Sequence, residues 1–172
     1  EEGFAVFVVD NTNRTEARYW IDDFLRVRQR QDNYHNTHNT LAMCKKYVTK
    51  HLSKEFEVSK ADQAELLNET MKYFQEQESF SMDDFSEKVI RQPEVVESFT
   101  RFRQEYEQDR DIRIEDEFGI SDSAVKKQAR SYKSVIKLDR NFHIYVHGNR
   151  NLLEQGEDEK GKFYKVYYEE EE

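Results

Sequence analysis

Residues 137–150 read KLDRNFHIYVHGNR, and this stretch decides how the fold ends. Residues 134–138 before it are mostly apolar and partly β-branched, and residues 139–141 form a polar break that tolerates a turn. Apolar and polar or amphipathic side chains then alternate in the order Phe142, His143, Ile144, Tyr145, Val146 and His147. Period-two alternation is typical of a half-buried strand. We therefore predict a β-hairpin with Phe142, Ile144 and Val146 facing the core.

A two-stranded hairpin is marginal in water and needs a further strand or a helix to cover it. Residues 163–168 supply a candidate third strand after a break at residues 156–161. The sequence therefore predicts a small C-terminal antiparallel sheet of three strands.

The composition favours a folded, helix-rich chain. Charged residues make up 37% of the 172 residues and hydrophobic residues 36%, but 13% are aromatic, which argues against disorder. One proline and five glycines leave room for long helices. Helical spacing of apolar residues predicts a helix over about residues 15–31 and further helices with the following apolar faces: Leu41, Cys44, Val48 and Leu52; Ala64, Leu67, Met71 and Phe74; Val95, Phe99, Phe102 and Tyr106; Val125, Ala129 and Tyr132.

Capping patterns mark the starts of several of these helices. Ser59 with Asp62 resembles an N-cap with an acidic third position, and Phe80 and Phe85 are spaced as a hydrophobic staple around a second cap. Pro93 is expected to end one helix and begin the next. The segment 32–39 is polar and fits either a break or a continued helix, and residues 109–117 are acidic and expected to be irregular.

The order of elements predicts an α+β fold, with one N-terminal strand, about six helices and then the three-stranded sheet. The N-terminal strand is the apolar run at residues 4–9, which reads as buried on both faces. We therefore expect residues 1–13 to be left from a missing N-terminal domain and residues 14–172 to form a helical domain that ends in the sheet. No apolar run is long enough to span a membrane, and Cys44 is the single cysteine.

The net charge of −9 argues against non-specific nucleic-acid binding by the chain as a whole, but the charge is uneven. Residues 124–150 carry an excess of +6, from Lys126, Lys127, Arg130, Lys133, Lys137, Arg140 and Arg150 against Asp139. Such a basic stretch could contact phosphates. The alternative is that these side chains balance the acidic segments 105–117 and 154–159.

The sequence offers only weak candidates for catalytic or metal-binding groups. His143 and His147 would lie roughly 13 Å apart on a strand, too far to share a metal ion. His35 and His38 could share a helix face but have no further ligand beside them. Cys44 lies on an apolar helical stripe, where a buried structural thiol is expected. The carboxylates Asp10, Glu16, Asp22 and Asp23 carry little weight as a catalytic cluster, because acidic residues are frequent throughout the chain. The sequence predicts no enzyme, no metal site and no cofactor.

Four stretches carry a resemblance to a known family. They are Val9-Asp10-Asn11-Thr12-Asn13 with Glu16-Ala17 and Tyr19-Trp20; Phe56-Glu57-Val58-Ser59-Lys60-Ala61-Asp62; Ala124-Val125-Lys126-Lys127-Gln128-Ala129-Arg130; and Lys137-Leu138-Asp139 with residues 142–150. In this order and spacing the chain resembles the C-terminal part of the bacterial nucleoid-associated protein family (NdpA/YejK-like).

The resemblance implies a cytoplasmic, nucleoid-located protein that associates with DNA and has no established catalytic residues. If the chain contacts DNA directly, the expected phosphate-facing patch is Lys126, Lys127, Arg130, Lys133, Arg140 and Arg150. The alternative is a protein–protein interaction or self-association module, in which the missing N-terminal domain contacts DNA. Expected partners are then a nucleoid protein or a second copy of the chain, and no membrane.

Overall fold

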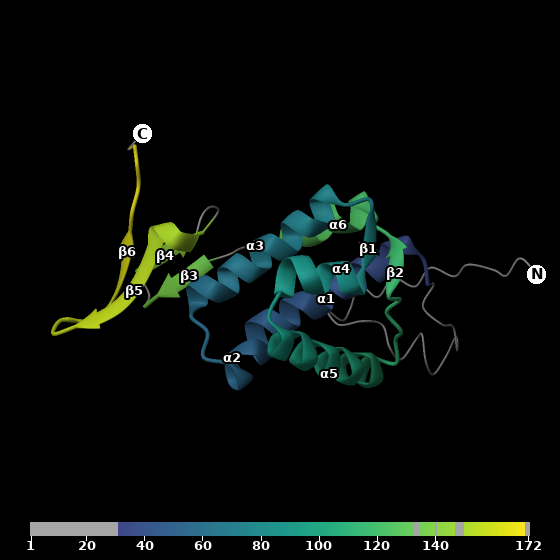
Figure 1. The fold of residues 1–172 in the computed structure, drawn as a ribbon. Helices are drawn as coiled ribbons and strands as arrows, with labels where there is room; N and C mark the ends of the chain where they lie inside the picture. Colours follow the sequence, from purple (N-terminus) through teal and green to yellow (C-terminus); the bar gives the residue numbers. More distant parts are fainter. Residues whose placement is uncertain (1–30, 133–134, 140, 147–149, 171–172) are drawn as a thin grey trace, which may run out of the picture. The chain divides into compact units, whose positions relative to one another are not determined.

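The computed structural model describes residues 31–132, 135–139, 141–146 and 150–170, which form helices with short antiparallel strands between and after them (Figure 1). The helical elements are α1 (Asn33–Lys46), the π-helical η2 (Tyr47–His51), α2 (Leu52–Glu55), α3 (Lys60–Glu76), α4 (Met82–Phe85), the π-helical η3 (Ser86–Ile90), α5 (Pro93–Arg110), α6 (Asp122–Ala129) and the 3-10 turn η4 (Arg150–Leu152). The strands are β1 (Ser79–Ser81), β2 (Glu117–Gly119), β3 (Val135–Leu138), β4 (Phe142–Tyr145), β5 (Leu153–Asp158) and β6 (Gly161–Val166). The predicted α+β class is confirmed.

Helix α1 begins inside the polar segment that fitted either a break or a helix. Asp32 is its N-cap, and its carboxylate accepts a hydrogen bond from the backbone N–H of His35 at 3.0 Å. The polar residues 33–39 are therefore the first two turns of a helix that continues through η2 and α2. The predicted apolar face is confirmed, because Leu41, Cys44, Val48 and Leu52 are all buried.

Helix α3 starts at the predicted capping box. The Ser59 hydroxyl accepts a hydrogen bond from the backbone N–H of Asp62 at 3.1 Å, and the Asp62 carboxylate accepts one from the backbone N–H of Ser59 at 2.9 Å. Both contacts satisfy amide groups that a helix start otherwise leaves open. The predicted face of Ala64, Leu67, Met71 and Phe74 is buried.

The second predicted cap, at the start of α4, differs from the cap at the start of α3. Phe80 and Phe85 pack with ring centroids 5.6 Å apart, as expected for a staple, but the Ser81 side chain makes no capping hydrogen bond. The first amide of α4, that of Met82, instead donates to the carbonyl of Asp116 at 2.9 Å. A neighbouring segment supplies the acceptor because β1 pairs with β2 at this point.

Pro93 separates two helical segments as predicted. η3 ends at Ile90, Arg91 has a positive φ of 67°, and α5 begins with Pro93. The α5 face of Val95, Phe99, Phe102 and Tyr106 is buried. Helix α5 continues to Arg110, so only the later part of the acidic segment 109–117 is irregular.

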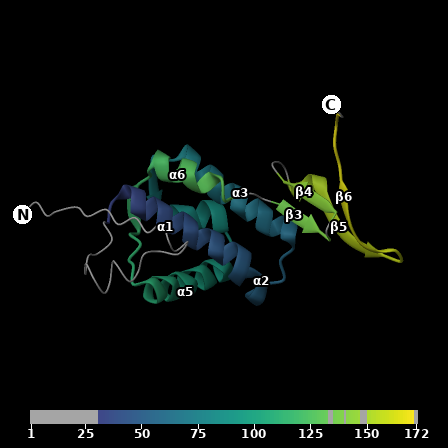
Figure 2. The same cartoon turned by 180° about the vertical axis from the view of Figure 1, so that it is seen from behind.

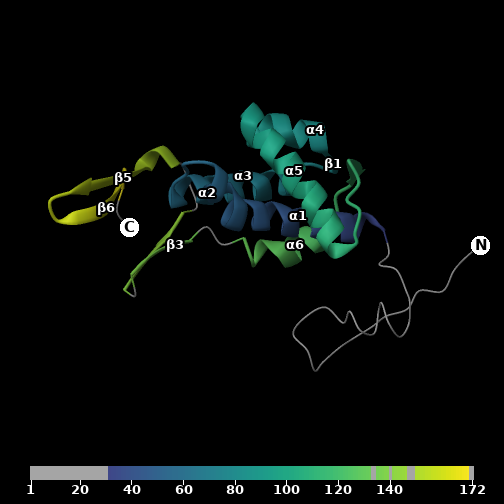
Figure 3. The same ribbon diagram turned by 90° about the horizontal axis from the view of Figure 1, so that it is seen from below.

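Helix α1 lies between α5 and α6 (Figures 1 and 3). On one side the Tyr47 hydroxyl, in the continuation of α1, donates to Ser98 Oγ of α5 at 3.0 Å. On the other side the backbone N–H of Ser121, the N-cap of α6, donates to Thr37 Oγ1 at 3.0 Å. The buried side chains of these helices form the main core, which is rich in aromatic rings. Among the described helices, none combines the length and apolar character needed to cross a membrane.

The described strands form three separate two-stranded antiparallel sheets, β1–β2, β3–β4 and β5–β6. The predicted three-stranded sheet is therefore wrong. Residues 161–166 pair with residues 153–158, which include part of the predicted break, and the turn lies at Glu159 and Lys160. A hairpin with a two-residue turn closes a very short loop, so its entropic cost is low compared with pairing to β4.

The β3–β4 hairpin is confirmed, with Ile136 opposite Ile144 and Leu138 opposite Phe142. The prediction for Phe142 is wrong, because its side chain is 65% exposed, whereas Val146 is buried and Ile144 is half-buried. A second core cluster of Ala61, Ala64, Ile136, Val146 and Leu153 has Ile144 and Leu138 of the hairpin packed against it, but not Phe142. Phe142 adjoins the turn and lies beyond this cluster.

Helix α3 contributes Ala61 and Ala64 to this second cluster and also binds the backbone of the segment after β4. The Asn68 side-chain amide donates to the carbonyl of Val146 at 3.0 Å. Figure 2 shows β3 beyond one end of α3, seen from behind. The predicted strand at residues 4–9, the helix at 15–31 and the division at residue 13 lie outside the described residues.

Candidate nucleic-acid interface

Helix α6 carries the centre of the predicted phosphate-facing patch. Its buried side consists of Ala124 and Val125, which pack toward α1 and α3. Ile120 and Val125 have the spacing of a hydrophobic staple around the N-cap Ser121, and Tyr132 beyond the helix is buried. This apolar side faces the core and orients α6, so the residues on the opposite side of the helix face solvent.

Three contacts with α1 hold α6 in place. The first is the bond from Ser121 to Thr37 at the start of α6. Near its end the Gln128 side-chain amide lies 2.9 Å from Nδ1 of His38. Beyond the helix the Tyr132 hydroxyl donates to the carbonyl of Leu41. Burial raises the pKa of Tyr132 well above its ordinary value, so the hydroxyl remains a donor at physiological pH.

Lys126, Lys127 and Arg130 are exposed on the outer side of α6. Both lysines lie in the last turn and Arg130 is the C-cap. Basic residues at a helix C-terminus are favoured by the helix dipole. The Lys127 ammonium lies 3.3 Å from the Tyr34 hydroxyl and 6.0 Å from the centre of its ring. Tyr34 on α1 therefore contacts this basic face of α6.

Three carboxylates of the acidic segments that could have balanced these side chains pair with other residues. Arg103 forms ion pairs with Glu107 and Asp116, and Lys165 pairs with Glu154. Within the ranges that the structure describes, Lys126, Lys127 and Arg130 form no ion pair. Direct ion pairing to the acidic segments therefore does not account for the basic face of α6.

The structure places only part of the predicted patch. It brings Lys126, Lys127 and Arg130 together, whereas Lys133 and Arg140 lie outside the described residues. Arg150 begins η4, and its side chain is not described. Sequence reasoning missed Tyr34 and Gln128, because their place beside the patch depends on how α1 packs against α6.

The other candidate groups have structural roles where they are described. His35 Nδ1 lies 2.8 Å from Asp32 Oδ1, and His38 contacts Gln128. Burial raises the pKa of the Cys44 thiol, which keeps it protonated and poorly nucleophilic. Within the described ranges no three His, Cys, Asp or Glu side chains are grouped to hold a metal ion. Asp10, Glu16, Asp22, Asp23 and His147 lie outside those ranges.

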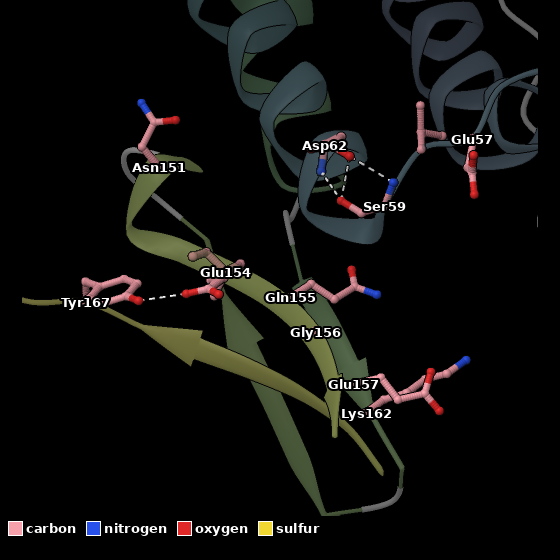
Figure 4. A pocket seen from close by; sticks show the side chains of 12 residues that line it. Glu57, Ser59, Asp62, Asn151, Glu154, Gln155, Gly156, Glu157, Lys162 and Tyr167 are labelled. Atoms are coloured by element: carbon pink, nitrogen blue, oxygen red, sulfur yellow. Dashed lines mark hydrogen bonds between the residues drawn. The ribbon is translucent and has the colours of Figure 1, made fainter. Parts of the chain in front are cut away.

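An open groove of about 880 Å³ lies between the start of α3 and the β5–β6 hairpin (Figure 4). Carboxylates line it, from Glu57, Asp62, Glu154 and Glu157, with Lys162 at one end. A groove of this charge repels phosphate groups. Among the surfaces described, the basic face of α6 is therefore the better candidate for DNA.

The class of protein follows from comparison with protein families. One family model matches residues 1–171, which is nearly the whole chain, and it describes nucleoid-associated proteins. The chain belongs to this family, whose description is nucleoid-associated protein YejK. No match is found among the curated proteins or among the solved structures. The family resemblance that the sequence motifs indicated is confirmed.

Proposed function

We propose that this chain associates with DNA in the bacterial nucleoid through the basic face of α6, without regard to base sequence and without catalysis. The main support is that Lys126, Lys127 and Arg130 are all exposed on α6 and form no ion pair in the described part of the chain. Lys133, Arg140 and Arg150 are proposed to extend the patch. Family membership supports the nucleoid association.

The physical basis of this proposal is local electrostatics. Each lysine or arginine that neutralises a phosphate releases condensed counterions, which favours binding at low salt. The chain's net charge of −9 opposes this, but ionic screening limits its reach to about 8–10 Å. A contact surface with a local excess of +6 between residues 124 and 150 can therefore bind phosphates although the whole chain is acidic.

The proposal includes no catalytic group and no cofactor. Family membership supports a non-enzymatic role, and the buried Cys44 offers no accessible thiol. A nucleoid-associated protein acts where the bacterial chromosome lies, so the proposed location is the cytoplasmic nucleoid.

The test is fluorescence anisotropy of a labelled duplex, titrated with the chain at about 50 and about 200 mM salt. The test variant carries Lys126→Glu, Lys127→Glu and Arg130→Glu. The matched control carries Lys50→Glu, Lys54→Glu and Lys72→Glu, which are exposed lysines on other helical elements. Both variants change the net charge equally, so their comparison separates a local surface from overall charge.

We expect the α6 variant to weaken binding at low salt by at least about tenfold and to flatten the slope of log K against log salt by about two to three. The control should show a smaller loss and a nearly unchanged slope. Equal losses in both variants would show that only overall charge matters. Absence of binding by the unmodified chain at low salt would overturn direct DNA contact.

A second candidate function is a protein–protein interaction module, favoured by a different observation. In the described ranges, the large hydrophobic side chains with high exposure all come from the C-terminal hairpins and the residues beside them. They are Phe142, Tyr145, Leu152, Val166, Tyr167 and Tyr168, with exposures of 43–69%. Several exposed side chains of this size in one part of the chain favour an interaction surface. DNA would then be contacted by a partner or by the N-terminal domain to which residues 1–13 are proposed to belong.

A further inference from the structure

Helix α1 carries lysines that the predicted phosphate-facing patch did not include. Residues 33–54 contain no aspartate or glutamate, and this is the longest stretch without an acidic residue in a chain that has 36 of them. Lys45 and Lys46 lie in the last turn of α1. We propose that both lysines bind phosphates of the duplex that contacts α6, so that the DNA surface crosses from α6 onto α1. This inference rests on the proposed function and adds a second helix to its surface.

A buried tyrosine joins Lys45 to the end of α6. The Tyr132 hydroxyl donates to the carbonyl of Leu41, which precedes Lys45 by one turn of α1. Burial is the main cause of the raised pKa of this hydroxyl, and smaller effects come from the backbone N–H of Lys45 and from Tyr106 on α5. Because Arg130 precedes Tyr132 by two residues, Lys45 lies next to the segment that ends the basic face of α6.

Lys45 has a partly buried ammonium group without a carboxylate partner. Burial lowers the pKa of this group below its ordinary value. Within the described ranges neither Lys45 nor Lys46 forms an ion pair. A cation that has lost part of its hydration is stabilised by an opposite charge brought beside it. A DNA phosphate supplies such a charge.

Aromatic rings of α5 restrict the side chain of Lys46. Its ammonium lies 5.3 Å from the centre of the Tyr106 ring and 5.9 Å from the centre of the Phe102 ring. The Arg110 guanidinium lies 4.7 Å from the centre of the same Tyr106 ring. Lys46 nevertheless remains exposed to solvent. A charged side chain that is already held in place loses less entropy when it contacts a phosphate.

The order of the helices gives the proposed surface its width. Helix α1 lies between α6 and α5 (Figures 1 and 3), and Lys46 reaches over rings of α5. Neighbouring helices pack 8–10 Å apart, so a surface from α6 to the edge of α5 is roughly 16–20 Å wide. The major groove of DNA is about 12 Å wide. The combined surface is therefore wide enough to contact phosphates of both strands, whereas α6 by itself is narrower than the groove.

Neutralising the two lysines tests the extension onto α1. The test variant carries Lys45→Gln and Lys46→Gln. The matched control carries Lys54→Gln and Lys72→Gln, which are exposed lysines of α2 and α3. Lys50 is left out of this control because it follows Lys46 by four residues on the continuation of α1. Each variant is titrated into a labelled duplex at about 50 and about 200 mM salt, with fluorescence anisotropy as the readout.

We expect the α1 variant to flatten the slope of log K against log salt by about two, which is one for each phosphate contact, and to weaken binding at low salt by about tenfold. The control should leave the slope nearly unchanged. Lys45→Arg with Lys46→Arg keeps both charges and should bind as the unmodified chain does. An α1 variant with the same slope as the control would overturn the extension.

Protection from acetylation provides a second measurement, which uses the unmodified chain. Lysines are acetylated briefly with and without the duplex, and the modified positions are quantified by mass spectrometry. With free duplex at about ten times its dissociation constant, acetylation of Lys45 and Lys46 should slow by about tenfold, because only about one chain in ten remains unbound. Lys54 and Lys72 should react at unchanged rates. Equal rates for Lys45 and Lys46 with and without duplex would contradict the proposed contacts.

The two helices can be tested separately with the same duplex. If the α6 variant of the proposed function weakens binding but the α1 variant does not, the extension fails and the proposed function stands. If only the α1 variant weakens binding, α6 is not the DNA surface, and both the proposed function and the shared surface fail. Absence of binding by the unmodified chain at low salt overturns both. Losses in both variants beyond those of their controls support the combined surface.

Discussion

The Tyr132 hydroxyl donates a hydrogen bond to the carbonyl oxygen of Leu41, across 91 positions of the sequence. Both residues are buried, and the bond fixes the segment that follows α6 against the middle of α1. The position of the basic face of α6 therefore depends on a buried contact that lies behind it.

Replacing this hydroxyl should destabilise the fold measurably. Tyr132→Phe keeps the ring but removes the donor, and we expect a loss of about 1 kcal/mol in the free energy of unfolding. Urea unfolding followed by circular dichroism measures it. Tyr168→Phe is the control, because Tyr168 is 69% exposed and its change should stay within about 0.5 kcal/mol. Equal effects would mean that the buried bond contributes no net stability.

Two serines at helix starts make a matched pair for testing the caps. Ser59 accepts the backbone N–H of Asp62, whereas the Ser81 side chain makes no capping bond. Ser59→Ala should therefore cost about 1 kcal/mol of unfolding free energy, and Ser81→Ala only a few tenths. Chemical denaturation at a single pH compares them. A larger loss for Ser81→Ala would contradict the capping roles assigned here.

Two phenylalanines separate the core from the exposed hairpin. Phe80 is 1% exposed and stacks on Phe118 with ring centroids 4.8 Å apart, whereas Phe142 is 65% exposed. Phe80→Ala should cost about 3–5 kcal/mol, because it leaves a cavity. Phe142→Ala should change stability by less than about 0.5 kcal/mol. A strong loss for Phe142→Ala, measured at a concentration where the chain is monomeric, would show that this ring is covered in solution.

Asp84 should make stability depend on pH in the acid range. The Lys88 ammonium, at 2.8 Å, and the Tyr73 hydroxyl, also at 2.8 Å, hold the pKa of the Asp84 carboxyl below its ordinary value of 3.8. The unfolded chain then binds a proton more readily than the folded one, so the contribution is fully present above about pH 4. It is lost as the pH falls through the lower folded pKa.

We therefore expect Asp84→Asn to reduce the difference in unfolding free energy between about pH 6 and about pH 3. Urea unfolding at both pH values measures this difference. Asp83→Asn is the neighbouring control, because Asp83 is exposed and forms no ion pair among the described residues. If both variants kept the pH dependence of the unmodified chain, Asp84 would have no part in it.

Local patterns predicted the helices well. The capping box at Ser59, the stop before Pro93 and the buried stripes on α3 and α5 all depend on side chains within a few positions of each other. Their physical causes, which are amide satisfaction, the fixed φ of proline and helical periodicity, act over one or two turns. The sequence therefore contained enough information for each of these elements.

Long-range choices were not predictable in the same way. Whether β6 pairs with β4 or with β5 depends on loop entropy and on which apolar surface is already occupied. The exposure of Phe142 depends on where the cluster around Ile136 ends. Similarly, Tyr34 joins the α6 surface only because α1 packs there. Periodicity indicates which side of an element is apolar, but it does not identify the neighbour that covers it.

The two core clusters have a consequence for how this chain unfolds. The larger one surrounds the helices, whereas the smaller one joins β3, the end of β4 and β5 to only a short part of α3. Detaching the C-terminal strands thus exposes few buried side chains and leaves the aromatic centre intact. Opening of these strands is expected to precede loss of the helices, so heating should give two transitions, and amide protons in β5 and β6 should exchange with solvent sooner than those in α1.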